Sequence, residues 1–92
     1  MIRSFRHKGL RRFFETGSTA GIQPSHARRL QAILTLLDAA KVIEDLGASR
    51  LKLHALRGQQ HGRWSVWVNG NWRLTFELYD SHVSVLDYED YH

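Results

Sequence analysis

Hydrophobic residues in the first half of the chain recur at helical spacing. Leu10, Phe13 and Phe14 fall on one side of a helix predicted for residues 9–15, and Gly17 is a stop signal. A longer helix is predicted to begin after a Ser25 cap. Its apolar positions follow the i, i+3, i+4, i+7 pattern: Ala27, Leu30, Ile33, Leu34, Leu37 and Ala40. This helical segment is expected to span residues 26–46, its end a kinked or separate turn that Gly47 closes, and residues 2–5 are expected to form a strand.

From Leu51 the spacing changes from helical to an alternation of apolar and polar residues, as in a half-buried strand. The segments RWSVWVN and WRLTFELY flank Asn69-Gly70, a strong turn signal. A two-residue loop would set the apolar face of one strand against the polar face of the other. A three-residue loop with a bulge avoids this mismatch. The predicted pairs are Val68 with Trp72, Val66 with Leu74 and Trp64 with Phe76.

The same register predicts the contacts on the opposite face of the sheet. It sets Trp67 beside Arg73 as a cation–π neighbour, and Arg63 beside Glu77 as an ion pair. After Asp80-Ser81 a third strand is expected to return, with residues 90–92 alongside the 69–73 corner. Its predicted pairs are Leu78 with Val83, Phe76 with Val85 and Arg73 with Tyr88. The expected architecture is an α+β fold in which helices cover one face of an antiparallel sheet, and the other face, with Arg63, Trp67, Arg73, Thr75 and Tyr88, remains for a ligand.

Length and composition limit the class of protein. The 92 residues suffice for one domain, expected to span 1–92, and 42% of them are hydrophobic. No cysteine is present, which excludes disulfides and thiolate metal sites. No stretch has the length of a membrane span or the apolar core of a signal peptide, so a soluble cytoplasmic protein without a membrane partner is expected.

The charges are unevenly distributed. Residues 1–75 contain all 13 lysines and arginines with four acidic residues, whereas residues 76–92 contain five acidic residues and neither lysine nor arginine. A basic body of this kind indicates a polyanionic partner such as nucleic acid, although solubility alone also explains it.

Several residues together could cleave a phosphodiester bond without a metal. The reaction needs a base for the 2′-hydroxyl, an acid for the leaving 5′-oxygen and a cation for the charge on the phosphate. His54, Arg73, Asp90, Tyr91 and His92 offer these groups. Lys52 and Arg57, close to His54 in the chain, would attract a phosphate. Taken singly, each residue also has an ordinary structural explanation, and His54, Asp90 and His92 leave a metal site as an alternative.

Four segments closely resemble the HigB-type toxins, or plasmid-maintenance killer proteins, of the RelE/ParE superfamily. They are MIRSFRHKGL, KLHALRG, WSVWVNGNWRLTF and DYEDYH. The resemblance implies a RelE-like, microbial ribonuclease-type fold. It implies a type II toxin that cleaves mRNA on the translating ribosome, without a metal or other cofactor. It further implies a HigA-type helix-turn-helix antitoxin, and operator DNA bound indirectly through that antitoxin.

The resemblance assigns roles to individual residues. The active-site histidine of the family falls on His54, the arginine of NWR on Arg73, and the terminal acidic-aromatic-histidine motif on Asp90, Tyr91 and His92. Substrate contacts are expected at Arg57, Lys52, Asn71 and Trp67. Family members have lysine at the position of Arg57, and an arginine there cannot release a proton. Contacts with ribosomal RNA are expected from the basic residues Arg3, Arg6, Lys8, Arg11, Arg12, Arg28 and Arg29.

Three other classes of function fit parts of the sequence. One is a binding module with the same fold that acts through a protein partner, as ParE-like relatives do. Another is a metal-dependent hydrolase that uses His54, Asp90 and His92. The last is an RNA-binding α+β protein without activity. The joint presence of His54, Arg73, Asp90 and His92 favours the nuclease.

Overall fold

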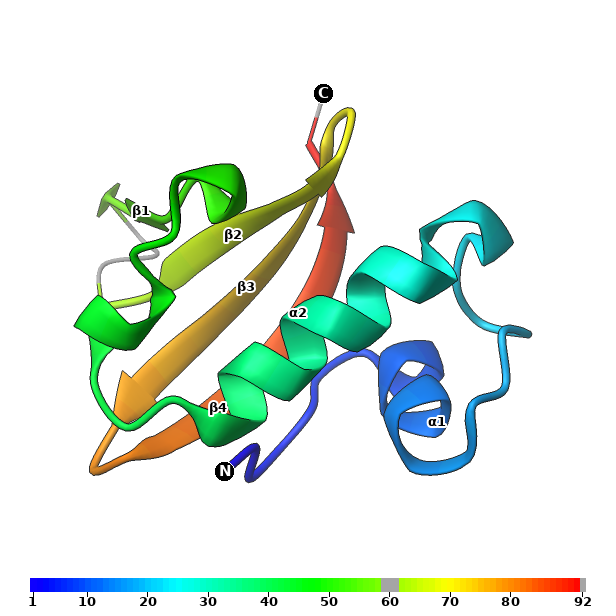
Figure 1. Ribbon diagram of the computed structural model, residues 1–92, viewed down its shortest axis with the longest axis horizontal. Coiled ribbons are helices and arrows are strands. Elements are labelled where there is room, and N and C mark those ends of the chain that lie inside the picture. Colours follow the sequence, from blue (N-terminus) through cyan, green and yellow to red (C-terminus); the bar gives the residue numbers. More distant parts are fainter. Residues whose placement is uncertain (59–61, 92) are drawn as a thin grey trace.

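A computed structural model describes residues 1–58 and 62–91 as two helices against a four-stranded antiparallel sheet (Figure 1). The helices are α1 (Lys8–Thr16) and α2 (Ala27–Ala39), and the strands are β1 (His54–Ala55), β2 (Trp64–Asn69), β3 (Trp72–Tyr79) and β4 (His82–Asp90). Three short 3-10 turns, η1 (Pro24–His26), η2 (Ile43–Leu46) and η3 (Ser49–Leu51), connect them. The strands follow one another in the order β1-β2-β3-β4. The expected α+β class is therefore confirmed.

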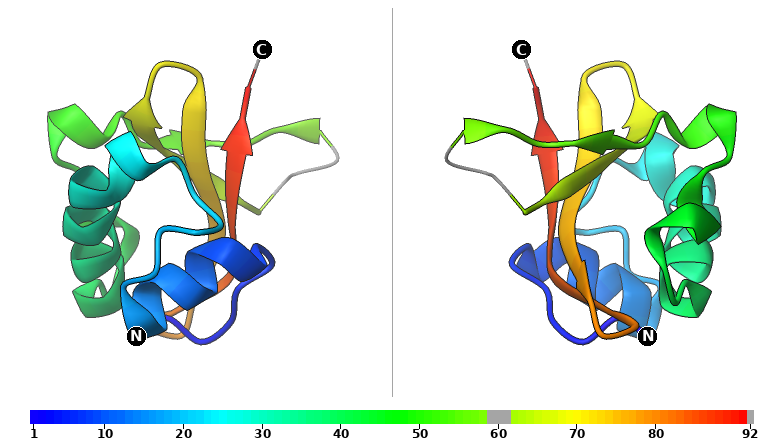
Figure 2. Two further views of the ribbon diagram at one scale, coloured as in Figure 1. Left: turned by 90° about the vertical axis from the view of Figure 1, so that its right-hand side faces the viewer. Right: turned by 90° about the vertical axis from the view of Figure 1, so that its left-hand side faces the viewer.

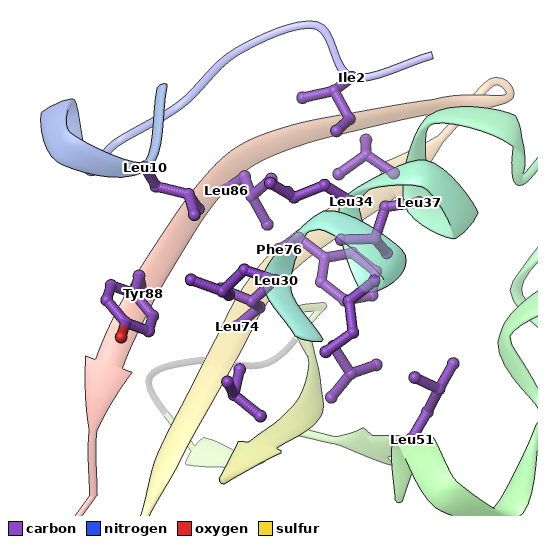
Figure 3. Packing of buried hydrophobic residues seen from close by; sticks show 14 of the residues in the cluster. Ile2, Leu10, Leu30, Leu34, Leu37, Leu51, Leu74, Phe76, Leu86 and Tyr88 are labelled. Atoms are coloured by element: carbon purple, nitrogen blue, oxygen red, sulfur yellow. The ribbon is translucent and has the colours of Figure 1, made fainter. Parts of the chain in front are cut away.

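The core lies between α2 and one face of the sheet. Leu30, Ile33, Leu34 and Leu37 of α2 are buried, in the spacing that the sequence pattern predicted. Figure 3 shows three of them facing Leu74, Phe76 and Leu86 of β3 and β4. Burial of each such side chain contributes on the order of 2 kcal/mol. The other face of the sheet points away from α2, and β1 projects on that side (Figure 2).

At the start of α2 the predicted cap is wrong, whereas at its end the predicted separate turn is confirmed. Ser25 lies inside η1 and caps nothing; the residue before α2 is His26, which also makes no capping bond. The helix ends at Ala39, and residues 43–46 form the separate turn η2 with Gly47 at its end, which confirms one of the two endings expected for the 26–46 segment. The Asp45 carboxylate fixes this break because it accepts from the backbone nitrogens of Lys41 and Val42.

The N-terminal segment runs beside the first half of β4. Single parallel bridges join Ile2 to Val83 and Phe5 to Leu86, so the predicted strand at residues 2–5 is present only as two isolated bridges. Ser4 adds a side-chain contact, because its hydroxyl accepts from the backbone nitrogen of Val85. The start of the chain thereby covers an edge of β4 that would otherwise have unpaired backbone groups.

The β2–β3 hairpin has the predicted bulge. Trp64 pairs with Phe76, Val66 with Leu74 and Trp67 with Arg73, as expected. The pairing then shifts between Trp67 and Asn69, so that Asn69 and not Val68 pairs with Trp72. The extra residue lets the buried Val68 point into the core without reversing the faces of the strand.

A second bulge, in β4, was not predicted. Leu78 pairs with Val83 as expected, but beyond it the register moves by one residue, and Tyr88 pairs with Leu74 instead of Arg73. The predicted pair of Phe76 with Val85 is therefore also wrong. Val85 adopts a φ of +52°, which is strained for a β-branched residue. The shift turns Leu86 and Tyr88 into the core, where each is almost completely buried, and this burial favours the bulge.

Candidate active site

The open face of the sheet, which points away from α2, brings together polar side chains from three strands. Residues that pair across antiparallel strands share a face, so the register identifies two rows. One row is Ser65, Thr75 and Asp87, and the next is Trp67, Arg73 and Glu89. The expected members Arg63, Trp67, Arg73 and Thr75 are present. Tyr88, also expected there, lies on the α2 side because of the bulge in β4.

Arg63 anchors a buried polar chain on this face. Its side chain is largely buried, and its Nη2 donates to Thr75 Oγ1 at 3.0 Å and to the Val85 carbonyl oxygen at 3.0 Å. Its Nη1 lies 3.6 Å from Glu77 Oε2, which confirms the predicted ion pair. The Thr75 hydroxyl in turn donates to Glu89 Oε2. One hydrogen-bonded chain thus links Arg63, just before β2, to Thr75 of β3 and Glu89 of β4, and it includes the Val85 carbonyl at the second bulge.

Arg73 and Tyr91 place on the same face buried polar atoms that have no hydrogen-bond partner among residues 1–58 and 62–91. Neither Nη1 of Arg73 nor the hydroxyl of Tyr91 makes a hydrogen bond to any residue in the described part of the chain. Burial raises the pKa of Tyr91, and the nearby Glu89 carboxylate raises it further, whereas Arg63 and Arg73 act in the opposite direction. A buried donor without a partner is unfavourable unless a ligand supplies one.

Tyr91 is bound to the turn between β2 and β3. Its backbone nitrogen donates to the Asn71 carbonyl oxygen at 2.8 Å, so Tyr91 lies at the 69–73 corner, as predicted. His92, the last predicted catalytic residue, lies outside the residues that the structure describes.

Asp90 lies on the opposite side of β4 from Glu89. It pairs with Trp72, whose ring stacks on Tyr88 with centroids 4.4 Å apart. Its carboxylate also contributes to the raised pKa of Tyr88, which is due first to burial. The structure therefore brings Glu89, and not Asp90, onto the face of Arg73. The sequence does contain a signal for this: the adjacent apolar residues Val85 and Leu86 interrupt the alternation of β4.

His54 lies at the edge of the open face, on β1. It pairs with Ser65, which continues the row that Thr75 and Asp87 form. The ring is exposed, and its Nδ1 donates to the Lys52 carbonyl oxygen at 2.6 Å. Because a carbonyl can only accept, this bond places a proton on Nδ1 and leaves Nε2 for proton transfer.

Trp67 contacts two cations, neither of which is Arg73. The Arg29 guanidinium lies 5.0 Å and the Lys52 ammonium 4.5 Å from its ring centroid. The predicted cation–π contact with Arg73 is therefore replaced, although the strand pairing itself is confirmed. Arg29 also donates to the carbonyl oxygens of Trp67, Val68 and Arg50. Its guanidinium thus holds α2 against β2 and η3.

The other predicted binding residues are exposed. Arg57 and Asn71 are near the open face, after β1 and in the β2–β3 turn. Arg11 forms an ion pair with Glu15 at 3.3 Å within α1. The remaining basic residues of the predicted ribosome contact are on the surface around α1 and at the start of α2: Arg3, Arg6, Lys8, Arg12 and Arg28.

The metal alternative has no complete set of ligands in the described residues. Within 1–58 and 62–91, no three histidine or acidic side chains gather closely enough to hold a metal ion. The set proposed from the sequence includes His92, which is outside these ranges. Nor does any helix in the described part of the chain have the length and apolarity to cross a membrane.

Comparisons with known proteins agree with the expected fold and family. A solved structure of a YafQ mutant from E. coli matches with a TM-score of 0.62 at 16% identity, covering 98% of this chain and 93% of that one, and this likeness concerns the fold alone. The Endoribonuclease HigB of Proteus vulgaris is 42% identical over 92 residues, the full length of both chains. Residues 3–92 match the family model of the RelE-like toxin of type II toxin-antitoxin system HigB. The chain therefore belongs to the HigB-like toxins, the RelE-like toxins of type II toxin–antitoxin systems.

Proposed function

We propose that this toxin is an endoribonuclease that cleaves mRNA on the translating ribosome, and that the open face of its sheet binds the scissile phosphate. The name of the Proteus vulgaris relative supports the endoribonuclease activity. The observation that carries the proposal for the site is the pair of buried, unpartnered polar groups, Arg73 Nη1 and the Tyr91 hydroxyl, on one face. An RNA phosphate supplies the acceptor oxygens that both groups lack.

Cleavage requires a base, an acid and a cation around that phosphate. The 2′-oxygen attacks phosphorus while the base takes its proton, and the bond to the 5′-oxygen breaks while the acid protonates the leaving oxygen. The products are a 2′,3′-cyclic phosphate and a free 5′-hydroxyl. His54, through Nε2, and His92 divide the proton transfers, and Arg73 stabilises the charge that develops on the phosphate. This chemistry needs side chains alone and no metal.

Other residues hold the message. Tyr91 positions a base or the phosphate from the end of β4. Asp90, at the same end of the strand, orients or activates a neighbouring group. Lys52, Arg57, Trp67 and Asn71 border the open face and contact the RNA chain. The open face has too few catalytic groups to cleave free RNA efficiently. Ribosomal RNA therefore completes the positioning of the message.

The exposed basic residues contact ribosomal RNA. This proposal covers Arg3, Arg6, Lys8, Arg11, Arg12 and Arg28; the guanidinium of Arg29 is already engaged with β2 and η3. Phosphate contacts release counterions, so ribosome binding weakens steeply with salt if these residues bind RNA.

Membership in a type II system implies an antitoxin that neutralises this toxin. We assign this partner to the HigA-type helix-turn-helix proteins, with operator DNA bound through the antitoxin. Translated messages lie in the cytoplasm, where the toxin acts.

Primer extension on a defined message tests the proposed function. The protein is compared with and without translating ribosomes, and with a chelator of transition metals that spares ribosomal magnesium. We expect cleavage within codons, only with ribosomes, unaffected by the chelator and abolished in His92→Gln and Arg73→Ala. Arg50→Ala, which removes an exposed arginine outside the site, is the matched control and cleaves normally. Cleavage retained in both site variants contradicts the assignment, and no cleavage by the folded wild-type protein favours a binding module that acts through a protein partner.

A further inference from the structure

The carboxylate that pairs with Arg73 across the sheet is held by another group. Glu89 pairs directly with Arg73 across β3 and β4, and opposite charges at such positions usually attract each other. Nevertheless, the ion pairs among the described residues are Arg11 with Glu15 and Arg63 with Glu77, and Arg73 is in neither. Instead, Glu89 Oε2 accepts from the Thr75 hydroxyl.

Arg63 complements that hydrogen bond, because the carboxylate accepts the Thr75 proton while Arg63 donates to a lone pair of the same hydroxyl. Its Nη2 donates to Thr75 Oγ1 at 3.0 Å, which leaves the single hydroxyl proton of Thr75 for Glu89. Thr75 is completely buried and Arg63 is 7% exposed, so this arrangement has little competition from water. The positive charge of Arg63 also offsets the negative charges of Glu77 and Glu89 around it.

This arrangement affects phosphate binding, because the Arg73 guanidinium can form a close ion pair with only one anion at a time. A guanidinium already paired with Glu89 would have to lose that carboxylate before it could bind a phosphate. An unpaired Glu89 carboxylate on this face would also repel the RNA backbone. The hydrogen bond from Thr75 keeps Glu89 from pairing with Arg73, and the positive charge of Arg63 offsets the negative charge of Glu89, so neither residue needs to contact the substrate.

We propose that Arg63 and Thr75 are positioning residues that hold Glu89 away from Arg73, so that the Arg73 guanidinium stays available for the phosphate of the message. The inference rests on the proposed function of Arg73 as the phosphate-binding cation. It gives a specific task to Arg63 and Thr75, which the sequence predicted only as members of the open face, and to Glu89, which the sequence did not place there.

A double-mutant cycle tests this arrangement. Thr75→Val replaces the hydroxyl by a methyl group of similar size and frees Glu89 to pair with Arg73. Single-turnover cleavage on the ribosome should fall at least about tenfold, because Arg73 must then be released from Glu89. In the Glu89→Gln background, where the competing charge is absent, the same Thr75→Val change should cost less than about threefold. Thr75→Ser, which keeps the hydroxyl, is the matched control and should retain cleavage.

A purely structural role of Thr75 gives a different result. In that case Thr75→Val lowers cleavage by the same factor with Glu89 and in the Glu89→Gln background, and that equality overturns the inference. Thermal unfolding of each variant shows which proteins are folded at the assay temperature. A crystal structure of Thr75→Val provides a second readout: Glu89 within 4 Å of the Arg73 guanidinium supports the inference, and an unmoved Glu89 contradicts it.

Failure of the inference is distinguishable from failure of the proposed function. If Arg73→Ala abolishes cleavage while the cycle shows no coupling, only the positioning role is wrong. If the wild-type protein does not cleave mRNA on ribosomes, the proposed function itself is wrong.

Discussion

The polar groups buried on the α2 side of the sheet are paired with one another, whereas those on the open face are not all paired. On the α2 side, the Tyr88 hydroxyl lies 2.6 Å from His26 Nδ1 and accepts from the Gln23 backbone nitrogen. On the open face, buried atoms of Arg63, Arg73 and Tyr91 have no hydrogen-bond partner in the described part of the chain. The first arrangement stabilises the fold, and the second leaves binding capacity for a ligand at some cost in stability.

The largest effect on stability is expected from the α2 side. Phe76→Ala removes a completely buried ring between β3 and α2 and should lower the free energy of unfolding by about 3–5 kcal/mol. Urea denaturation measures the change. A loss below about 1 kcal/mol would show that this side of the sheet does not supply the main packing.

On the open face the corresponding change should affect activity instead. Arg73→Ala removes a half-buried cation that makes no ion pair within the described residues, so stability should change by less than about 1 kcal/mol. Cleavage on the ribosome should fall by about 100-fold or more, as when one stabilising group of an oxyanion site is lost. Arg73→Lys, which keeps the charge without the fork, should recover part of the rate. Equal losses of stability for Arg73→Ala and Phe76→Ala would remove the distinction between the two faces.

The hydrogen bond between His26 and Tyr88 provides a second test of the α2 side of the sheet, with a smaller expected loss of stability than Phe76→Ala. Tyr88→Phe removes the hydroxyl and leaves His26 Nδ1 and the Gln23 nitrogen without a partner, at a cost of about 1–2 kcal/mol. Cleavage should persist at temperatures where the variant is folded, because Tyr88 lies on the α2 side. Loss of cleavage in a fully folded Tyr88→Phe protein would mean that this side also contributes to the reaction.

The same pair predicts a pH dependence of stability. Burial lowers the pKa of His26 from 6.5, so the unfolded chain binds this proton more readily than the folded protein. The contribution of the neutral His26 side chain to the free energy of unfolding is therefore fully present above pH 6.5. It is lost as the pH falls through the lower pKa that His26 has in the folded protein. Urea denaturation at pH 7.5 and at pH 5.5 measures the free energy of unfolding. Between these two pH values it should fall by more in the wild type than in His26→Gln. An equal loss in both proteins would assign the pH dependence to other groups.

The smallest expected effect concerns the bulge in β4. Val85→Gly relieves a φ of +52° that a β-branched side chain rarely adopts, and should change stability by less than about 1 kcal/mol, in the favourable direction. The Val85 carbonyl can still accept from Arg63, so the open face should keep its arrangement. A loss of several kcal/mol would show that the Val85 side chain, and not the bulge, is needed there.

The sequence by itself determined the helices and hairpins that are specified by residues close together in the chain. The helical spacing of Leu30, Leu34 and Leu37 predicted the buried side of α2, and the alternation around Asn69-Gly70 predicted a bulged hairpin and most of its register. The quoted segments also sufficed to recognise the HigB-type toxin family. In the helix and the hairpin, residues that are close in the sequence are also close in the structure. The family resemblance needs no contacts, because it rests on segments distributed along the chain.

Only the tertiary structure decided which residues of β4 reach the open face. The second bulge depends on Ser4, which binds the Val85 nitrogen, and on Arg63, which binds its carbonyl oxygen, and both are distant in the sequence. That one extra residue exchanged Tyr88 for Glu89 beside Arg73. Because the side chains of a strand alternate, a shift of one residue changes the face of all that follow, and long-range contacts alone fix such a shift.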